Sequence, residues 1–205
     1  MAIADVSNAE KGWVDAHDVI QRVITESNGV VTAGSGVASG TGVTVVESGD
    51  TAFKKTVLTF TNASIAMVDA TTAGSHGSLK VYTFPAGLIS YQGGTTNLTI
   101  ARVGTAITTT AAVVGAVGTA TVGTDDATLT DLEADLIPST ASTLTAGAGV
   151  TKGKYAVAPQ VPFDGTATAK EAYLNFAIPD AGSTGNDALL VNGTITIVWS
   201  NLGDN

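Results

Sequence analysis

From residue 51 onward, apolar and polar side chains alternate along several runs of the sequence. In residues 52–67 (AFKKTVLTFTNASIAM), Leu58 and Phe60 alternate with Thr59. A period of two residues is typical of a β-strand with one buried face. Turn residues separate this run from five further strand candidates, at residues 77–88, 96–104, 116–123, 170–179 and 188–202. The pattern predicts an all-β domain over residues 51–205, a β-sandwich with jelly-roll topology.

The first 50 residues have a different pattern. Ser7 and Glu10 have the spacing of a capping box, and apolar residues recur at helical spacing from Trp13 to Ile24. Asn28 and Gly29 provide a stop signal, so we expect a helix over residues 7–27. A Gly/Ser-rich linker and a short strand at residues 42–47 follow. The sequence therefore predicts an N-terminal helix-plus-linker arm, residues 1–50, outside the main domain.

Two segments inside the domain lack a clear strand pattern. Residues 125–137 (DDATLTDLEADLI) are expected to form a short helix capped by Asp125 or Asp126. In that helix Leu129, Leu132 and Leu136 would face inward. Residues 138–153 (PSTASTLTAGAGVTKG) are expected to be a loop, because small and turn-forming residues dominate them.

Composition and charge exclude several classes of partner. The formal net charge is −9, which disfavours contacts to nucleic-acid phosphates or to anionic membranes. Charged residues make up 13% of the chain, so the surface is expected to be neutral and rich in hydroxyl groups. Cysteine is absent, which excludes disulfides and thiolate chemistry. The uncharged run at residues 103–124 has bilayer-spanning length, but its threonines and glycines favour buried strands.

The residue types that carry catalysis are sparse. His17 and His76 are the two histidines of the sequence, and no metal-binding spacing connects them. No G-x-S-x-G motif marks a nucleophilic serine. We therefore predict no enzymatic activity, no catalytic residues, no cofactor and no metal.

Five carboxylates gather between residues 125 and 135, and three interpretations of them stay open. They could cap a helix and form a solvated face, hold a Ca²⁺ ion through oxygen ligands, or include a catalytic pair. The spacing does not match an EF-hand loop. The carboxylates are Asp125, Asp126, Asp131, Glu133 and Asp135.

Three strings of the sequence resemble a family of uncharacterised virion proteins of tailed bacteriophages. They are HGSLKVYTFPAGLI at residues 76–89, ADLIPSTASTLTAGAG at 134–149 and NGTITIVWSNLGDN at 192–205. The resemblance covers roughly residues 51–205 and carries no catalytic residue over. It implies a capsid decoration (cement) protein on the exterior of the virion, made in the host cytoplasm. The implied partner is the major capsid protein, and the implied assembly is a homotrimer.

The arm supplies the expected interface in this interpretation. Its apolar side would anchor the protein to the shell or to other subunits, with a tryptophan as the natural hot spot. Packing of that side on its own domain is the alternative. The expected interface residues are Trp13, Ile20, Ile24, Val30 and Val31.

Two other functions remain as alternatives. One is a head-fibre, tail or host-adhesion protein with a carbohydrate-binding jelly roll, for which Trp199 and Tyr91 are the obvious aromatic candidates. The other is a polysaccharide-degrading β-sandwich enzyme that would use Asp131 and Glu133.

Overall fold

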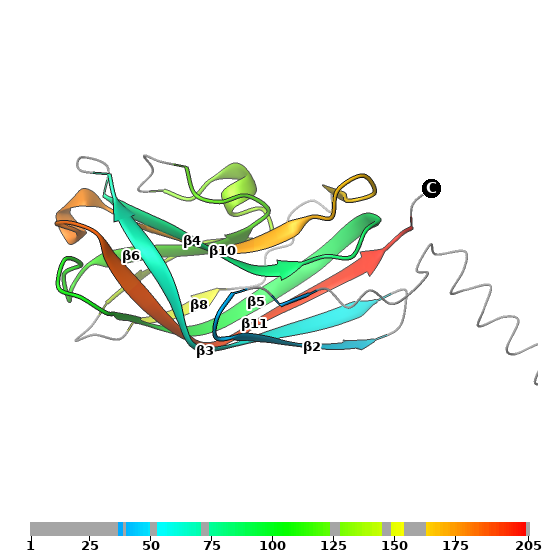
Figure 1. The fold of residues 1–205 in the computed structure, drawn as a ribbon, viewed down its shortest axis with the longest axis horizontal. Coiled ribbons are helices and arrows are strands. Elements are labelled where there is room, and N and C mark those ends of the chain that lie inside the picture. Colours follow the sequence, from blue (N-terminus) through cyan, green and yellow to red (C-terminus); the bar gives the residue numbers. More distant parts are fainter. Residues whose placement is uncertain are drawn as a thin grey trace, which may run out of the picture.

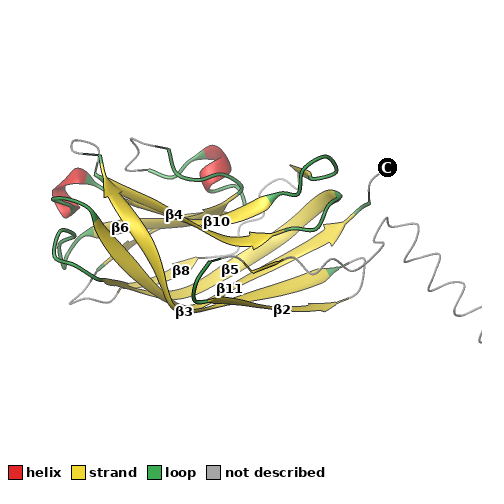
Figure 2. Ribbon diagram, in the orientation of Figure 1, coloured by secondary structure: helices red, strands yellow, loops and turns green. Residues whose placement is uncertain are grey.

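Two layers of antiparallel β-strands make up the structure, a computed structural model that describes residues 37–38, 40–49, 53–70, 74–123, 128–144, 149–153 and 163–203. The layers lie one above the other in Figure 1, and strands dominate the described chain in Figure 2. The strands are β1 (Val37–Ala38), β2 (Val43–Gly49), β3 (Lys54–Asp69), β4 (Ser75–Thr83), β5 (Leu88–Arg102), β6 (Ala112–Gly118), β7 (Ile137–Thr143), β8 (Gly149–Gly153), β9 (Phe163–Asp164), β10 (Glu171–Ile178) and β11 (Asp187–Asn201).

The strands pair in an order that differs from their order along the chain. The first layer runs β7-β6-β10-β4, with β1 pairing with β4. The second layer runs β2-β3-β11-β5, and both β8 and β9 pair with β5. Strand β3 belongs mainly to the second layer, but its last residues, Val68 and Asp69, pair with β4. This arrangement confirms the all-β sandwich of jelly-roll type that the sequence predicts.

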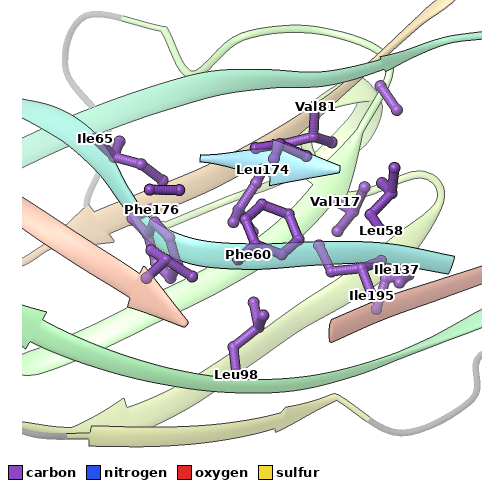
Figure 3. Packing of buried hydrophobic residues seen from close by; sticks show 14 of the residues in the cluster. Leu58, Phe60, Ile65, Val81, Leu98, Val117, Ile137, Leu174, Phe176 and Ile195 are labelled. Atoms are coloured by element: carbon purple, nitrogen blue, oxygen red, sulfur yellow. The ribbon is translucent and has the colours of Figure 1, made fainter. Parts of the chain in front are cut away.

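The core lies between the two layers. Leu58 and Phe60 of β3 and Ile195 of β11 point into it from the second layer, and Leu174 and Phe176 of β10 point into it from the first (Figure 3). Each of these side chains is at most 2% exposed. Burying one such side chain stabilises the fold by about 1.5–3 kcal/mol. The period-two alternation of the sequence is therefore what places the core.

Two expectations for local structure are wrong. Residues 138–143 and 149–153, expected to be a loop, belong to strands β7 and β8. They pair with β6 and β5, so their partners, rather than their own apolar pattern, hold them extended. In the described part of residues 125–137, a single 3₁₀ turn over Asp131–Glu133 replaces the expected helix.

The leucines of this segment are also arranged differently from the expectation. Leu129 and Leu136 are buried as expected, but Leu132 is 59% exposed. Leu129 packs with Ala116 of β6 and Ala177 of β10 in a small separate cluster, whereas Leu136 belongs to the main core.

The sheets begin before residue 51. Val37 and Ala38 pair with β4, and residues 43–49 pair with β3 along the whole length of β2. These residues therefore belong to the sandwich, and the expected boundary of the arm at residue 50 is too late. The expected helix at residues 7–27 and the residues Val30 and Val31 lie outside the described residues.

Candidate functional site

The outer face of the second layer is a broad surface of threonine and valine. Strand register aligns its side chains in rows across β2, β3, β11 and β5. One row holds Thr44, Thr59, Thr194 and Asn97, and its neighbour holds Val46, Val57, Thr196 and Thr95. We call this surface the threonine face, defined by Thr44, Val46, Lys55, Val57, Thr59, Thr95, Asn97, Thr99, Thr194, Thr196 and Val198.

No carboxylate belongs to the threonine face, although the protein carries a net charge of −9. Glu47 of β2 turns to the other side of its strand, where it accepts hydrogen bonds from the Tyr82 hydroxyl and from Thr56 Oγ1. Lys55 is the single charged residue of the face. Each threonine offers a hydroxyl group and a methyl group, so the surface can bind by hydrogen bonds and by apolar contact.

A buried polar network supports the face from behind. Trp199 Nε1 donates to Thr56 Oγ1 at 2.9 Å, and Thr56 Oγ1 donates to Glu47 Oε1 at 3.2 Å. Thr56 is fully buried and Trp199 is 1% exposed. Because these bonds join β11, β3 and the outermost strand β2, they fix β2 to the core. The face is therefore a rigid surface rather than a collection of loose strands.

The outer face of the first layer is different, because the chain itself covers part of it. Asn175 of β10 donates through Nδ2 to the carbonyl oxygens of Ala120 and Glu133, at 2.9 and 2.8 Å. Its Oδ1 accepts a bond from Ser78 Oγ, which itself accepts one from the backbone N–H of Val122. These bonds hold the described parts of residues 119–136 on the sheet.

The acidic residues of this covering segment have structural partners. Glu133 Oε1 accepts a bond from the backbone N–H of Gly123 at 2.7 Å. Asp135 accepts bonds from Thr119 N and Thr119 Oγ1, at 2.8 and 2.7 Å. Burial of Asp135 raises its pKa, despite the opposing effect of the bonds from Thr119. These contacts give Glu133 and Asp135 a structural role, but the two carboxylates stabilise a loop instead of capping a helix as expected.

A Ca²⁺ site is not supported by the part of the chain that the structure describes. No three His, Asp or Glu side chains come together there in a way that could hold a metal ion. Asp125 and Asp126 lie outside the described residues. Of the two histidines, His17 also lies outside the described residues, and half-buried His76 is part of strand β4, opposite Val68 and Ala177.

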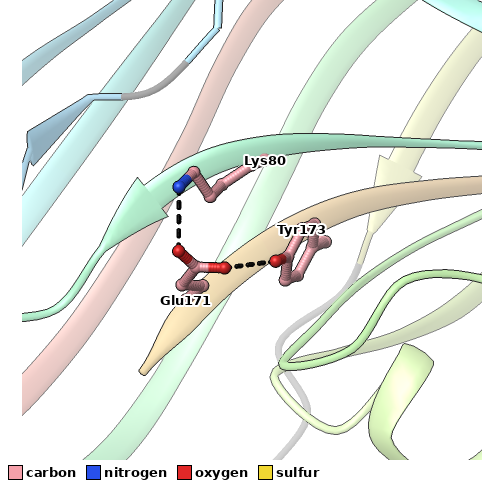
Figure 4. A network of polar contacts seen from close by, with 3 residues as sticks. All are labelled: Lys80, Glu171 and Tyr173. Carbon is pink, nitrogen blue, oxygen red and sulfur yellow. Dashed lines mark hydrogen bonds and ion pairs between the residues drawn. The ribbon is translucent and has the colours of Figure 1, made fainter. Parts of the chain in front are cut away.

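One polar cluster lies on the exposed part of the first layer. Lys80 Nζ contacts Glu171 Oε1 at 2.8 Å, and the Tyr173 hydroxyl donates to Glu171 Oε2 (Figure 4). The bonds from Lys80 and Tyr173 lower the pKa of Glu171. The bond to the carboxylate raises the pKa of Tyr173 to about 12. Sequence reasoning missed this cluster, because its members are brought together by the pairing of β4 with β10.

The two aromatic residues proposed for carbohydrate binding are buried. Trp199 is 1% exposed and Tyr91 is 7% exposed, so neither ring can stack on a sugar. Trp199 has the same strand parity as Ile195 and Ile197, which also face the core. That parity was the signal in the sequence that Trp199 is a core residue.

A shallow depression lies between residues 108–112 and residues 179–182, and no titratable side chain lines it. Its lining is made of small and hydroxyl-bearing residues, and it offers no acid, base or metal ligand. It is lined by Thr108, Thr110, Ala111, Ala112, Pro179, Ala181 and Gly182.

Comparison with known proteins leaves the family open. No protein-family model matches the sequence, and the search of curated proteins gives no match. Among solved structures, the chain is similar to a family 29 carbohydrate-binding module, CBM29-2, complexed with cellulohexaose. The TM-score is 0.30 at 13% identity, over 83% of this chain and 86% of that chain. Among the described residues, no helix has the length and hydropathy needed to span a bilayer.

Proposed function

We propose that the protein is a structural component of a tailed-phage virion. In its most specific form, the proposal is a non-catalytic capsid decoration (cement) protein that binds the major capsid protein on the exterior of the shell. The observation that supports it is the threonine face, a rigid, carboxylate-free surface on an otherwise acidic protein. A stabilising protein needs such an extended surface more than it needs a pocket.

The size of the face bears on the proposed trimer. Strands about 4.8 Å apart and residues about 3.3 Å apart along each strand give the face roughly 500 Å². A stable protein–protein interface buries about 800 Å² on each partner. One copy therefore offers too little area for tight binding through this face alone. Three copies, held together as the proposed homotrimer, offer enough.

The direct test uses shells assembled without the protein, from the major capsid protein of the phage that encodes it. We expect the purified protein to bind these shells in a fixed copy number and to raise the temperature at which they open. Thr194→Glu, which places a carboxylate in the centre of the face, should abolish binding. Ser139→Glu is the matched control on β7 of the other layer, and it should bind like the wild type. Wild-type protein that leaves the shells unbound would refute the proposal.

The proposed trimer has a separate test by light scattering, with and without the N-terminal residues. Because residues 37–49 belong to the sheets, the truncation must stop at residue 36. A trimer in both forms supports a self-contained decoration unit. A trimer that dissociates on truncation assigns oligomerisation to the arm, and a monomer in both forms contradicts the trimer.

The alternative is a head-fibre, tail or host-adhesion protein that binds carbohydrate. One observation favours it: half-buried Tyr173 lies beside the charged groups of Lys80 and Glu171. An aromatic ring next to polar groups is what a sugar ring requires. A screen against soluble glycans, with Tyr173→Ala as the negative control, tests this function. Binding that the substitution leaves intact would exclude Tyr173 as the site.

A further inference from the structure

A contiguous apolar patch lies at one end of the threonine face. Val46 of β2 and Val57 of β3 are direct cross-strand partners on the outer side of the sheet, and Val46 is 66% exposed. Lys55 lies two residues before Val57 on the same side of β3, and its cross-strand partner on β11 is Val198. Phe53, which is 59% exposed, directly precedes β3. We call this surface the lysine patch, defined by Val46, Phe53, Lys55, Val57 and Val198.

The chemistry of the lysine patch indicates what it would bind. Contiguous exposed apolar surface is a feature of protein-interaction sites. The patch carries one positive charge and no carboxylate. Lys55 is exposed, and it has no ion-pair partner among the residues that the structure describes. A matching partner presents an exposed apolar side chain directly beside a carboxylate.

A turn elsewhere on the same protein presents these two groups together. Leu132 is the middle residue of the 3₁₀ turn η1 (Asp131–Glu133), and it is 59% exposed. Its neighbour Asp131 is also exposed, and within the described part of the chain its carboxylate has no ion-pair partner. The turn is therefore complementary to the lysine patch in both apolar character and charge.

Hydrogen bonds hold this turn in one conformation. Glu133 accepts a bond from Gly123 N through Oε1, at 2.7 Å, and one from Thr130 N through Oε2, at 3.2 Å. The carbonyl oxygen of Glu133 accepts a bond from Asn175 Nδ2 of β10 at 2.8 Å, which ties the turn to the first layer. A pre-organised group of this kind loses little conformational entropy on binding.

The turn and the lysine patch lie on opposite sides of the sandwich. In Figure 1 the turn is the yellow-green coil at the top, above the first layer, and β2 is at the bottom, in the second layer. The core separates the two surfaces, so one chain cannot place its own turn on its own patch. A contact between them requires two molecules.

We propose that the protein binds a second copy of itself through these two surfaces. Leu132 of one copy packs on Val46 and Val57 of the next copy. Asp131 of the first copy then pairs with Lys55 of the second. The contact joins two different surfaces, so it is heterologous and builds a ring or a chain of copies, whereas a two-fold dimer would use the same surface twice. The proposed homotrimer would be one such ring, but the inference does not depend on a role in a virion.

Two variants that complement each other test the contact. Their masses are measured by sedimentation equilibrium from roughly 10 µM to 1 mM, a range suited to an interface below the standard size. We expect the wild type to exceed the mass of one copy at the upper end of this range. Val46→Glu disrupts the patch and leaves the turn intact, and Leu132→Glu does the reverse. Each variant alone should be a monomer, and an equimolar mixture should form a complex of two copies and nothing larger.

A matched control and a charge test accompany these variants. Val103→Glu changes a valine that is 57% exposed and lies outside both surfaces, so it should keep the mass of the wild type. Lys55→Gln and Asp131→Asn each remove one charge of the proposed ion pair. Either should weaken the association about twofold to fivefold, as expected for an exposed ion pair. The double variant should be no weaker than either single variant, because the ion pair is already lost in both.

Each outcome decides the inference. A wild type that is a monomer over the whole range overturns it, and so does a glutamate variant of either surface that keeps the mass of the wild type. A mixture that stays monomeric, or that assembles beyond two copies, also overturns it. Circular dichroism confirms that each variant is folded, and a complex of two copies forms only from folded variants. No shell is present in these experiments, so their result is independent of whether the protein binds a capsid.

Discussion

Thr56 should be one of the most sensitive polar positions in the sandwich. Its hydroxyl accepts the indole N–H of Trp199 at 2.9 Å and donates to Glu47 Oε1 at 3.2 Å, in a fully buried position. Thr56→Val keeps the shape of the side chain but leaves the buried indole N–H without its acceptor. An unsatisfied buried polar group costs about 1–3 kcal/mol. We expect the free energy of unfolding to fall by about 2 kcal/mol, which lowers the melting temperature by about 4–8 °C in a domain of this size.

Thr59→Val provides the matched control, because Thr59 is in the same strand on the solvent-facing side. A surface substitution of this kind changes stability by no more than about 0.5 kcal/mol. Both variants are unfolded in urea and followed by far-ultraviolet circular dichroism. The reasoning is refuted if Thr56→Val loses no more stability than Thr59→Val. That result would mean that the hydrogen bonds behind the threonine face contribute nothing net to holding β2.

Three further predictions concern the first layer. Asn175→Ala should lower the free energy of unfolding by about 3 kcal/mol, since the part-buried carbonyls of Ala120 and Glu133 lose their donor. It should also speed proteolysis within residues 119–136, and an unchanged cleavage rate contradicts this. The folded-state pKa of Asp135 is raised, so its carboxyl group favours the folded state at low pH and loses that advantage as the pH rises through the folded pKa. In urea unfolding series, the stability of Asp135→Asn relative to the wild type should therefore increase from acid to neutral pH. A stability difference that stays constant with pH would contradict the effect of burial on the pKa of Asp135. Glu171→Gln should lower the pKa of Tyr173 from about 12 toward 10 in an ultraviolet titration, whereas an unchanged value would mean that the carboxylate is not its cause.

Local sequence pattern was enough for most of the fold. The alternation in β3, β10 and β11 assigns Leu58, Phe176 and Ile195 to the core, because side chains of a strand alternate between its two faces wherever the strand lies. The same rule assigns Trp199 to the core, although its aromatic character suggested a binding residue. A short window of sequence is therefore enough to predict where a strand forms and which of its side chains are buried.

Strands without such an alternation could not be found in this way. Residues 139–143 have small and hydroxyl-bearing side chains, and they belong to β7 because β6 offers them a partner. The segment around Leu132 forms one turn instead of a helix, because hydrogen bonds from Asn175 hold it against the sheet. In both cases a contact with a distant part of the chain decides the local structure.

The sequence by itself determined the all-β class, the core residues of the alternating strands and the scarcity of catalytic groups. Only the tertiary structure decided which residues share a surface. Thr44, Thr59, Thr194 and Asn97 form one row because the register of β2, β3, β11 and β5 aligns them. Strand periodicity says that each of them faces outward, but register is set by pairing between distant segments, and a shift of one residue would turn the whole strand over. The threonine face is for that reason a product of the fold, while its threonines were visible in the sequence from the start.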